Sequence, residues 1–61
     1  MANLTSKELS ALEDQINCEQ TLVKKYQAMS SLCTDPVIQQ ELSGYAQKHR
    51  QHFDTLVSFL Q

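Results

Sequence analysis

The sequence predicts an all-α protein, an antiparallel two-helix hairpin that dimerises into a four-helix bundle. Three observations lead to this prediction. Apolar residues recur at alternating steps of three and four along two long segments, a pattern typical of helices that bury one face. One short Asp-Pro turn separates the segments, so the two helices should lie antiparallel and adjacent. The apolar stripes are wider than two helices can cover, so a second copy is expected to cover the rest.

The first helix is predicted at about residues 5–32. Thr5 followed three residues later by Glu8 is a capping-box pattern, which marks a helix start. The apolar stripe that follows contains one charged residue and is widened on one side by Leu22 and Met29. Its members are Leu9, Leu12, Ile16, Glu19, Val23 and Tyr26.

The second helix is predicted at about residues 36–60, after a turn at about residues 33–35. Thr34 or Asp35 can cap this helix, and Pro36 suits its first turn, where no N–H is needed. Its seam keeps a heptad spacing but contains two histidines. The seam residues are Ile38, Leu42, Tyr45, His49, His52, Leu56 and Phe59, with Ala46, Phe53 and Leu60 to one side.

Size and charge restrict what this chain can be. With 61 residues it is one domain, 1–61, and a domain this small is marginal alone. The net charge is −2 and the few basic residues are scattered, which argues against a nucleic-acid partner. The start of the chain lacks the pattern of a signal peptide, and no apolar run approaches the ~20 residues of a spanning helix. We therefore expect a protein kept in the cytoplasm, with no membrane partner.

Seven residues are expected to play ordinary structural roles. Cys18 and Cys33 would lie roughly 22 Å apart on one helix, too far for a disulfide within it, and are expected as small thiols in or near the core, with a bridge between two chains as the alternative. Gly44 is expected to be exposed and tolerated rather than a kink or a close contact. The tyrosines are expected in the core with their hydroxyls at its rim, and the lysines of "VKKY" on a solvated face. These residues are Tyr26, Tyr45, Lys24 and Lys25.

The polar residues of the two seams are predicted to meet in one layer. In a hairpin that turns at residues 33–35, residues whose numbers add to about 68 face each other. Glu19 is then level with His49, and Ile16 with His52. His49 and His52 are three residues apart, so both rings should project from one face of their helix into the core. Buried groups of this kind need partners, and these three side chains can supply them to one another.

This layer has two interpretations. Histidine nitrogens and a carboxylate suit zinc, iron or manganese, so Glu19, His49 and His52 are candidate metal ligands. Polar layers in helical bundles also fix register and partner number without binding anything. Other chemistry has no support, because the sequence has no phosphate-binding glycine-rich loop and no nucleophile that can be placed against a base.

Residues 18–61 resemble the ferritin-like helical pairs of the spore coat protein F family and of rubrerythrin-like proteins. The matching features are Glu19 with Tyr26 seven residues on, the Asp35–Pro36 turn and the histidine-bearing helix that ends in "HFDTLVSFLQ". In metal-binding ferritin-like proteins the first helix supplies a Glu and the second a Glu-x-x-His. By this resemblance Glu19 matches the first Glu and His52 the His, while His49 stands where those proteins have the second Glu.

The resemblance implies a ferritin-like bundle with a structural or assembly role in the spore coat, with other coat proteins as partners. We therefore predict a non-enzymatic structural or assembly protein that works as a homodimer. The alternative is a four-helix-bundle protein that binds metal through Glu19 and the His-x-x-His pair, in its strongest form with a redox role.

Overall fold

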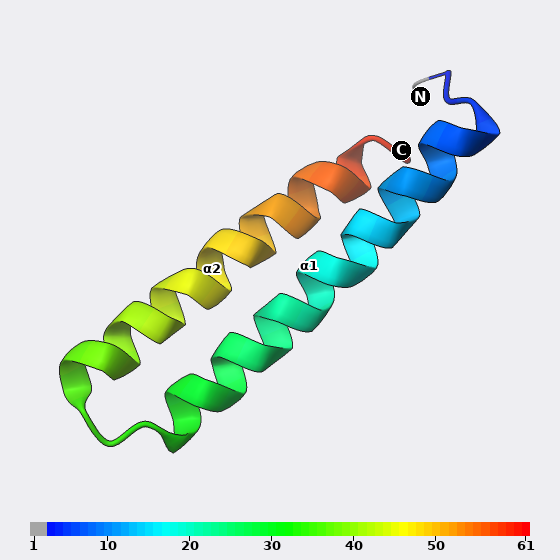
Figure 1. Cartoon of the computed structure of the whole chain (residues 1–61). Coiled ribbons are helices and arrows are strands. Elements are labelled where there is room, and N and C mark those ends of the chain that lie inside the picture. The colour runs from blue at the N-terminus through cyan, green and yellow to red at the C-terminus, as the bar shows by residue number, and fades with distance from the viewer. Residues whose placement is uncertain (1–2) are drawn as a thin grey trace.

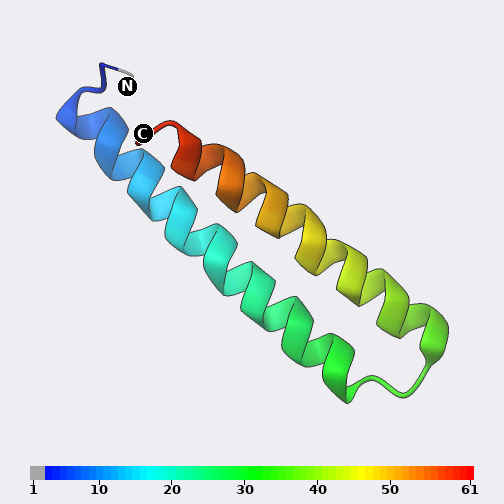
Figure 2. The same ribbon diagram turned by 180° about the vertical axis from the view of Figure 1, so that it is seen from behind.

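In the computed structural model, which describes residues 3–61, two α-helices pack side by side in opposite directions (Figure 1). Helix α1 spans Ser6–Leu32 and helix α2 spans Pro36–Ser58. The start of α1 and the end of α2 lie at the same end of the molecule, and the view from behind shows the same arrangement (Figure 2). The predicted all-α antiparallel hairpin is confirmed, whereas the four-helix bundle needs a second copy and stays a prediction.

The capping box predicted at the start of α1 is present. The Thr5 hydroxyl accepts a hydrogen bond from the backbone N–H of Glu8 at 3.1 Å, and the Thr5 N–H donates to Glu8 Oε1 at 3.0 Å. The backbone and side-chain hydrogen bonds with Thr5 lower the pKa of the Glu8 carboxyl. These two bonds satisfy backbone and side-chain groups that would otherwise depend on water, and they fix where the helix begins.

The second helix is capped by Asp35 rather than Thr34. Asp35 Oδ1 accepts from the N–H groups of Val37 at 2.9 Å and Ile38 at 3.1 Å. Pro36 occupies the first helical position, where its missing N–H costs nothing. The short side chain of Asp reaches the first free N–H groups of the helix, so the sequence Asp-Pro sets the start of α2.

Polar bonds also join the two helices beside the turn. Ser30 Oγ donates to the carbonyl oxygen of Gln39 at 3.1 Å, and Gln39 Nε2 donates to the carbonyl oxygen of Ser30 at 3.0 Å.

At the other end, α2 stops at Ser58, two residues before the predicted end. There the N–H groups of Phe59 and Leu60 bond three residues back, which tightens the last turn and ends the regular helix.

The interface between the helices is centred on Glu19, Val23 and Ala46, the buried residues of the described chain. Ala46 is buried whereas Tyr45 is exposed, so the face that α2 turns to α1 is rotated by about one residue from the predicted seam. A small side chain lets the two helices approach closely, and the bulky tyrosine is left at the side. The expected core position of Tyr45 is therefore wrong for the single chain, while Tyr26 is half-buried.

Several smaller predictions have mixed outcomes. Cys18 is exposed and not part of a core, Cys33 is half-buried, and both thiols are free. Gly44 is half-buried rather than exposed, but a Cβ built there meets no atom within 4 Å, so no close contact requires glycine. Lys24 and Lys25 are exposed as predicted. Neither helix of residues 3–61 is long and apolar enough to cross a membrane.

Candidate metal centre

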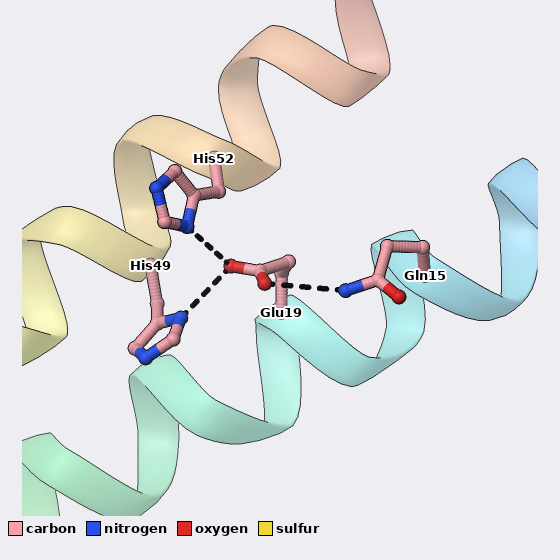
Figure 3. Close-up of polar contacts among 4 residues, drawn as sticks. All are labelled: Gln15, Glu19, His49 and His52. Carbon is pink, nitrogen blue, oxygen red and sulfur yellow. Dashed lines mark hydrogen bonds and ion pairs between the residues drawn. The ribbon is translucent and has the colours of Figure 1, made fainter.

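The polar layer is built where the two helices face each other at mid-length. Glu19 is the central residue of the 27-residue helix α1 and points across the interface. His49 and His52 come from α2, one turn apart, and both rings reach toward the Glu19 carboxylate (Figure 3). The i, i+3 spacing puts the two rings on neighbouring parts of one helix face, so a single side chain from α1 can meet both.

One carboxylate oxygen serves both imidazoles. The Nδ1 atom of His49 lies 3.0 Å from Glu19 Oε2, and the Nδ1 atom of His52 lies 3.2 Å from the same oxygen. The other oxygen, Oε1, accepts a hydrogen bond of 3.3 Å from Gln15 Nε2. The predicted convergence of Glu19, His49 and His52 is confirmed.

The three side chains differ strongly in exposure. The Glu19 side chain is 8% exposed and the His49 side chain 24%. The His52 side chain is 60% exposed, so the expectation that both imidazoles lie in the core is wrong for His52 in the single chain. The reason is the same rotation of α2, which brings Ala46 inward and moves the row of Tyr45 and His52 toward one side.

The buried carboxylate is stabilised in its ionised form. The hydrogen bond from His49 lowers the pKa of Glu19 most, burial opposes this, and the charges and hydrogen bond of the two histidines add to the lowering. In the tautomer with a proton on Nδ1, each ring donates to Oε2, and that oxygen has a lone pair for each donor. Within residues 3–61 no buried side-chain nitrogen or oxygen lacks a hydrogen-bond partner. The layer is thus complete as a hydrogen-bonded unit.

Aromatic contacts hold the ring of His49. Tyr26 stacks on it with ring centroids 5.6 Å apart and planes 4° apart, and His52 meets it edge-on at 5.6 Å and 85°. Tyr45 in turn packs edge-on against Tyr26. Contact from two sides limits the rotation of the His49 ring, so its Nδ1 atom stays directed at Glu19. The position of the His49 ring is therefore set by packing as well as by its hydrogen bond.

Sequence reasoning missed the hydrogen bond from Gln15 to Glu19 and the stacking of Tyr26 on His49. Gln15 lies four residues before Glu19, a spacing at which helical side chains meet, and this signal could have identified it. Tyr26 was expected as a core aromatic, but its stacking on a histidine of the other helix depends on ring orientation, which spacing does not supply.

The spacing of the ligand atoms fits a metal ion. One ligand atom from each of Glu19, His49 and His52 can be chosen so that all three lie within 4.8 Å of one another. In a tetrahedral zinc site with bonds of about 2.0–2.1 Å, neighbouring ligand atoms are about 3.3 Å apart. The two Nδ1–Oε2 distances are 3.0 and 3.2 Å. A metal could replace the two Nδ1 protons if the ligand atoms, which lie within 4.8 Å of one another, moved to about 3.3 Å, and it would keep at least one coordination position open.

Comparison with known proteins adds no relative to this geometry. No model of a protein family, no curated protein and no solved structure matches the chain. The resemblance of residues 18–61 to ferritin-like helix pairs stays a prediction, and the case for any function depends on the residues of the layer.

Proposed function

We propose that this chain is a metal-binding protein in which Glu19, His49 and His52 hold one divalent transition-metal ion. The observation that carries the proposal is the shared oxygen: two imidazole Nδ1 atoms from α2 converge on one carboxylate oxygen from α1. Two imidazoles and a carboxylate suit zinc, iron or manganese, with zinc the ion best matched to three ligands and an open position. The ligands come from both helices, so the ion would also tie the hairpin together.

Two residues outside the proposed ligand set support metal binding, because they hold the ligands in position. Gln15 holds the second carboxylate oxygen, and Tyr26 holds the His49 ring. Metal sites depend on such outer partners to orient their ligands. Because protons compete with the metal for imidazole nitrogen, binding should weaken as pH falls. The proposal is for binding and assigns no enzymatic activity.

The test is metal content of protein prepared without a histidine tag. We expect about one equivalent of metal per chain by elemental analysis after reconstitution with zinc, iron(II) or manganese. The variant His52→Ala should lose most of this metal and keep its helical circular dichroism, because the His52 side chain is largely exposed. Glu41→Ala is the matched control, since it removes an exposed carboxylate of the same helix.

Two results would contradict the proposal. Metal far below one equivalent with all three ions would show that the layer does not bind metal. Retention of metal by His52→Ala and His49→Ala together would place the metal elsewhere in the chain.

A second candidate function is a structural or assembly role without metal. It is supported by the completeness of the layer, in which every buried polar atom of residues 3–61 already has a partner. In this role the chain is a homodimeric, ferritin-like four-helix bundle in which the polar layer fixes the register of the helices. The resemblance to spore coat protein F would place that bundle among coat proteins. Failure of metal binding, with a stable dimer, is the outcome expected of this candidate.

A further inference from the structure

One long side of the hairpin leaves apolar side chains partly exposed. On α2 these side chains lie seven residues apart and therefore form a row along the helix. Ile38 is 52%, Tyr45 44% and Phe59 50% exposed. His52, the exposed member of the polar layer, occupies the remaining position of the same row. On α1, Tyr26 continues this side, as its ring contact with Tyr45 shows, and Leu22 and Met29 lie four residues before and three residues after it, on the same helix face. We call these six apolar residues the apolar face.

The surface that the whole chain exposes beyond that of an average monomer is close to what one partner contributes to a stable interface. The chain exposes 4776 Å². A folded monomer of 7.0 kDa is expected to expose about 4,000 Å². The excess of roughly 700 Å² compares with about 800 Å² buried by each partner in an interface of standard size. No side chain of residues 3–61 is fully buried, so the hairpin alone has little core. Covering the apolar face would supply one.

The polar layer lies at the position that a two-fold axis would use. Glu19 is the central residue of α1, and His49 lies within one turn of the middle of α2. In a two-fold dimer with full overlap, the same surface of each copy forms the contact. Two hairpins packed in this way bring their middles together, whether they run parallel or antiparallel. The two clusters of Glu19, His49 and His52 would then lie at one height.

From these observations we infer that a second copy of this chain covers the apolar face, with His52 inside the contact and both polar layers level. This inference deepens the metal-binding proposal and, for its metal dependence, rests on it. The single chain leaves the site open on the side of His52, and the second copy closes that side. A metal that fixes the His52 ring removes rotational freedom that dimerisation would otherwise have to remove. Metal should therefore tighten the dimer, by roughly 2- to 10-fold in the dissociation constant.

Sedimentation equilibrium, with zinc in one arm and a chelator in the other, tests both parts. We expect a dimer at micromolar concentration in both arms, with the lower dissociation constant in zinc. Ile38→Asp should weaken the dimer at least tenfold, because it places a charge in the contact. That variant should still fold, since an acidic residue suits the first turn of a helix. Gln40→Asp adds the same charge two residues further along α2, at an exposed position outside the row, and should leave the dimer unchanged.

A second pair of variants guards against misfolding, and circular dichroism reports helix content for all four. Tyr45→Asp should dissociate the dimer, and Gln47→Asp should not. A chain that is monomeric at 100 µM in both arms would overturn the inference. So would equal effects of the row variants and their controls.

The metal arm separates this inference from the metal proposal. If zinc binds at one equivalent but leaves the dissociation constant unchanged, the placement of His52 in the contact is wrong and the metal proposal stands. If zinc does not bind, the metal proposal fails, and the chelator arm still decides whether a second copy covers the apolar face.

Discussion

The two long sides of the hairpin differ in how far they shield apolar side chains from water. The apolar face exposes Met29, Ile38, Tyr45 and Phe59, and its one polar interruption is His52. The other side, which we call the polar face, is a shallow open groove between the helices. Val23 and Phe53 form its floor, and its rim is polar on both helices. The rim residues are Gln20, Lys24, Gln27 and Arg50.

The difference shows which side of the hairpin leaves apolar groups exposed to water. On the polar face, long side chains with apolar stems and polar ends line the groove beside Val23 and Phe53, of which Val23 is buried and Phe53 half-buried. On the apolar face Lys25 Nζ lies 5.8 Å from the centroid of the Tyr26 ring, but Ile38, Tyr45 and Phe59 remain 44–52% exposed. The polar layer of Glu19, His49 and His52 reaches the surface on this side of the molecule through the exposed His52. The proposed metal binding and the proposed association therefore both concern one side of the molecule.

The largest expected effect of a substitution is at Glu19. Glu19→Ala removes the partner of both histidines and leaves the Nδ1 atom of the part-buried His49 without a hydrogen bond in the interface. We expect the free energy of unfolding to fall by about 1–3 kcal/mol. Urea denaturation of metal-free protein at one fixed protein concentration measures this change.

The neighbouring residue supplies the control for this comparison. Gln20 follows Glu19 in the sequence but lies on the polar face. We expect Gln20→Ala to change the free energy of unfolding by no more than about 0.5 kcal/mol. Equal losses in the two variants would mean that the layer contributes no more than the groove does, and that the two sides are not distinct.

A smaller effect is expected from acid. Hydrogen bonding by His49 lowers the pKa of Glu19 in the folded chain below its ordinary value of 4.5. The stabilisation is therefore present above pH 4.5 and is lost as pH falls from there through the lower, folded-state pKa. Metal-free wild type should lose more stability between pH 5 and pH 3 than Glu19→Gln, which cannot ionise at that position.

Denaturation across this pH range gives the comparison, and Glu13→Gln, at an exposed position of α1, is its control. Glu13→Gln should follow the wild-type curve. If Glu19→Gln does so as well, the hydrogen bonds to the ionised carboxylate contribute nothing to folding.

The sequence predicted the hairpin because each of its signals is local. Each helix start is marked by residues at most three positions apart, Thr5 with Glu8 and Asp35 with Pro36. The structure shows both caps. The convergence of Glu19 with the histidines was also predictable, because a short turn makes residue numbers a measure of height along the hairpin. The early end of α2 was not, since nothing in "SFLQ" marks a stop.

Rotation of the helices about their axes is what the sequence left open. Positions 45 and 46 both suit the interface, and the choice of the smaller Ala46 depends on how closely two backbones approach. That choice decides that His52 lies at the side and that Tyr45 is exposed. Spacing was enough to predict which residues meet in the polar layer, whereas the exposed fraction of each side chain required the packed structure.

The smallest expected effect is at the rim of the polar face. Arg50 Nε lies 3.6 Å from Asp54 Oδ1, and both side chains are about two-thirds exposed. An exposed ion pair of this kind contributes little, because water screens the charges and two long side chains lose freedom. Asp54→Ala should change the free energy of unfolding by less than about 0.5 kcal/mol. Arg50→Ala should do the same if the ion pair is all that the arginine contributes.

Comparing the two variants separates charge from packing. Arg50→Ala also removes an apolar stem beside Phe53, whereas Asp54→Ala leaves that stem in place. Urea denaturation at matched protein concentration should show both variants near wild type. If Arg50→Ala alone loses more than about 1 kcal/mol, its stem covers the groove floor as a core residue would. The polar face would then be closed by its own side chains, and the apolar face would remain the side that needs a partner.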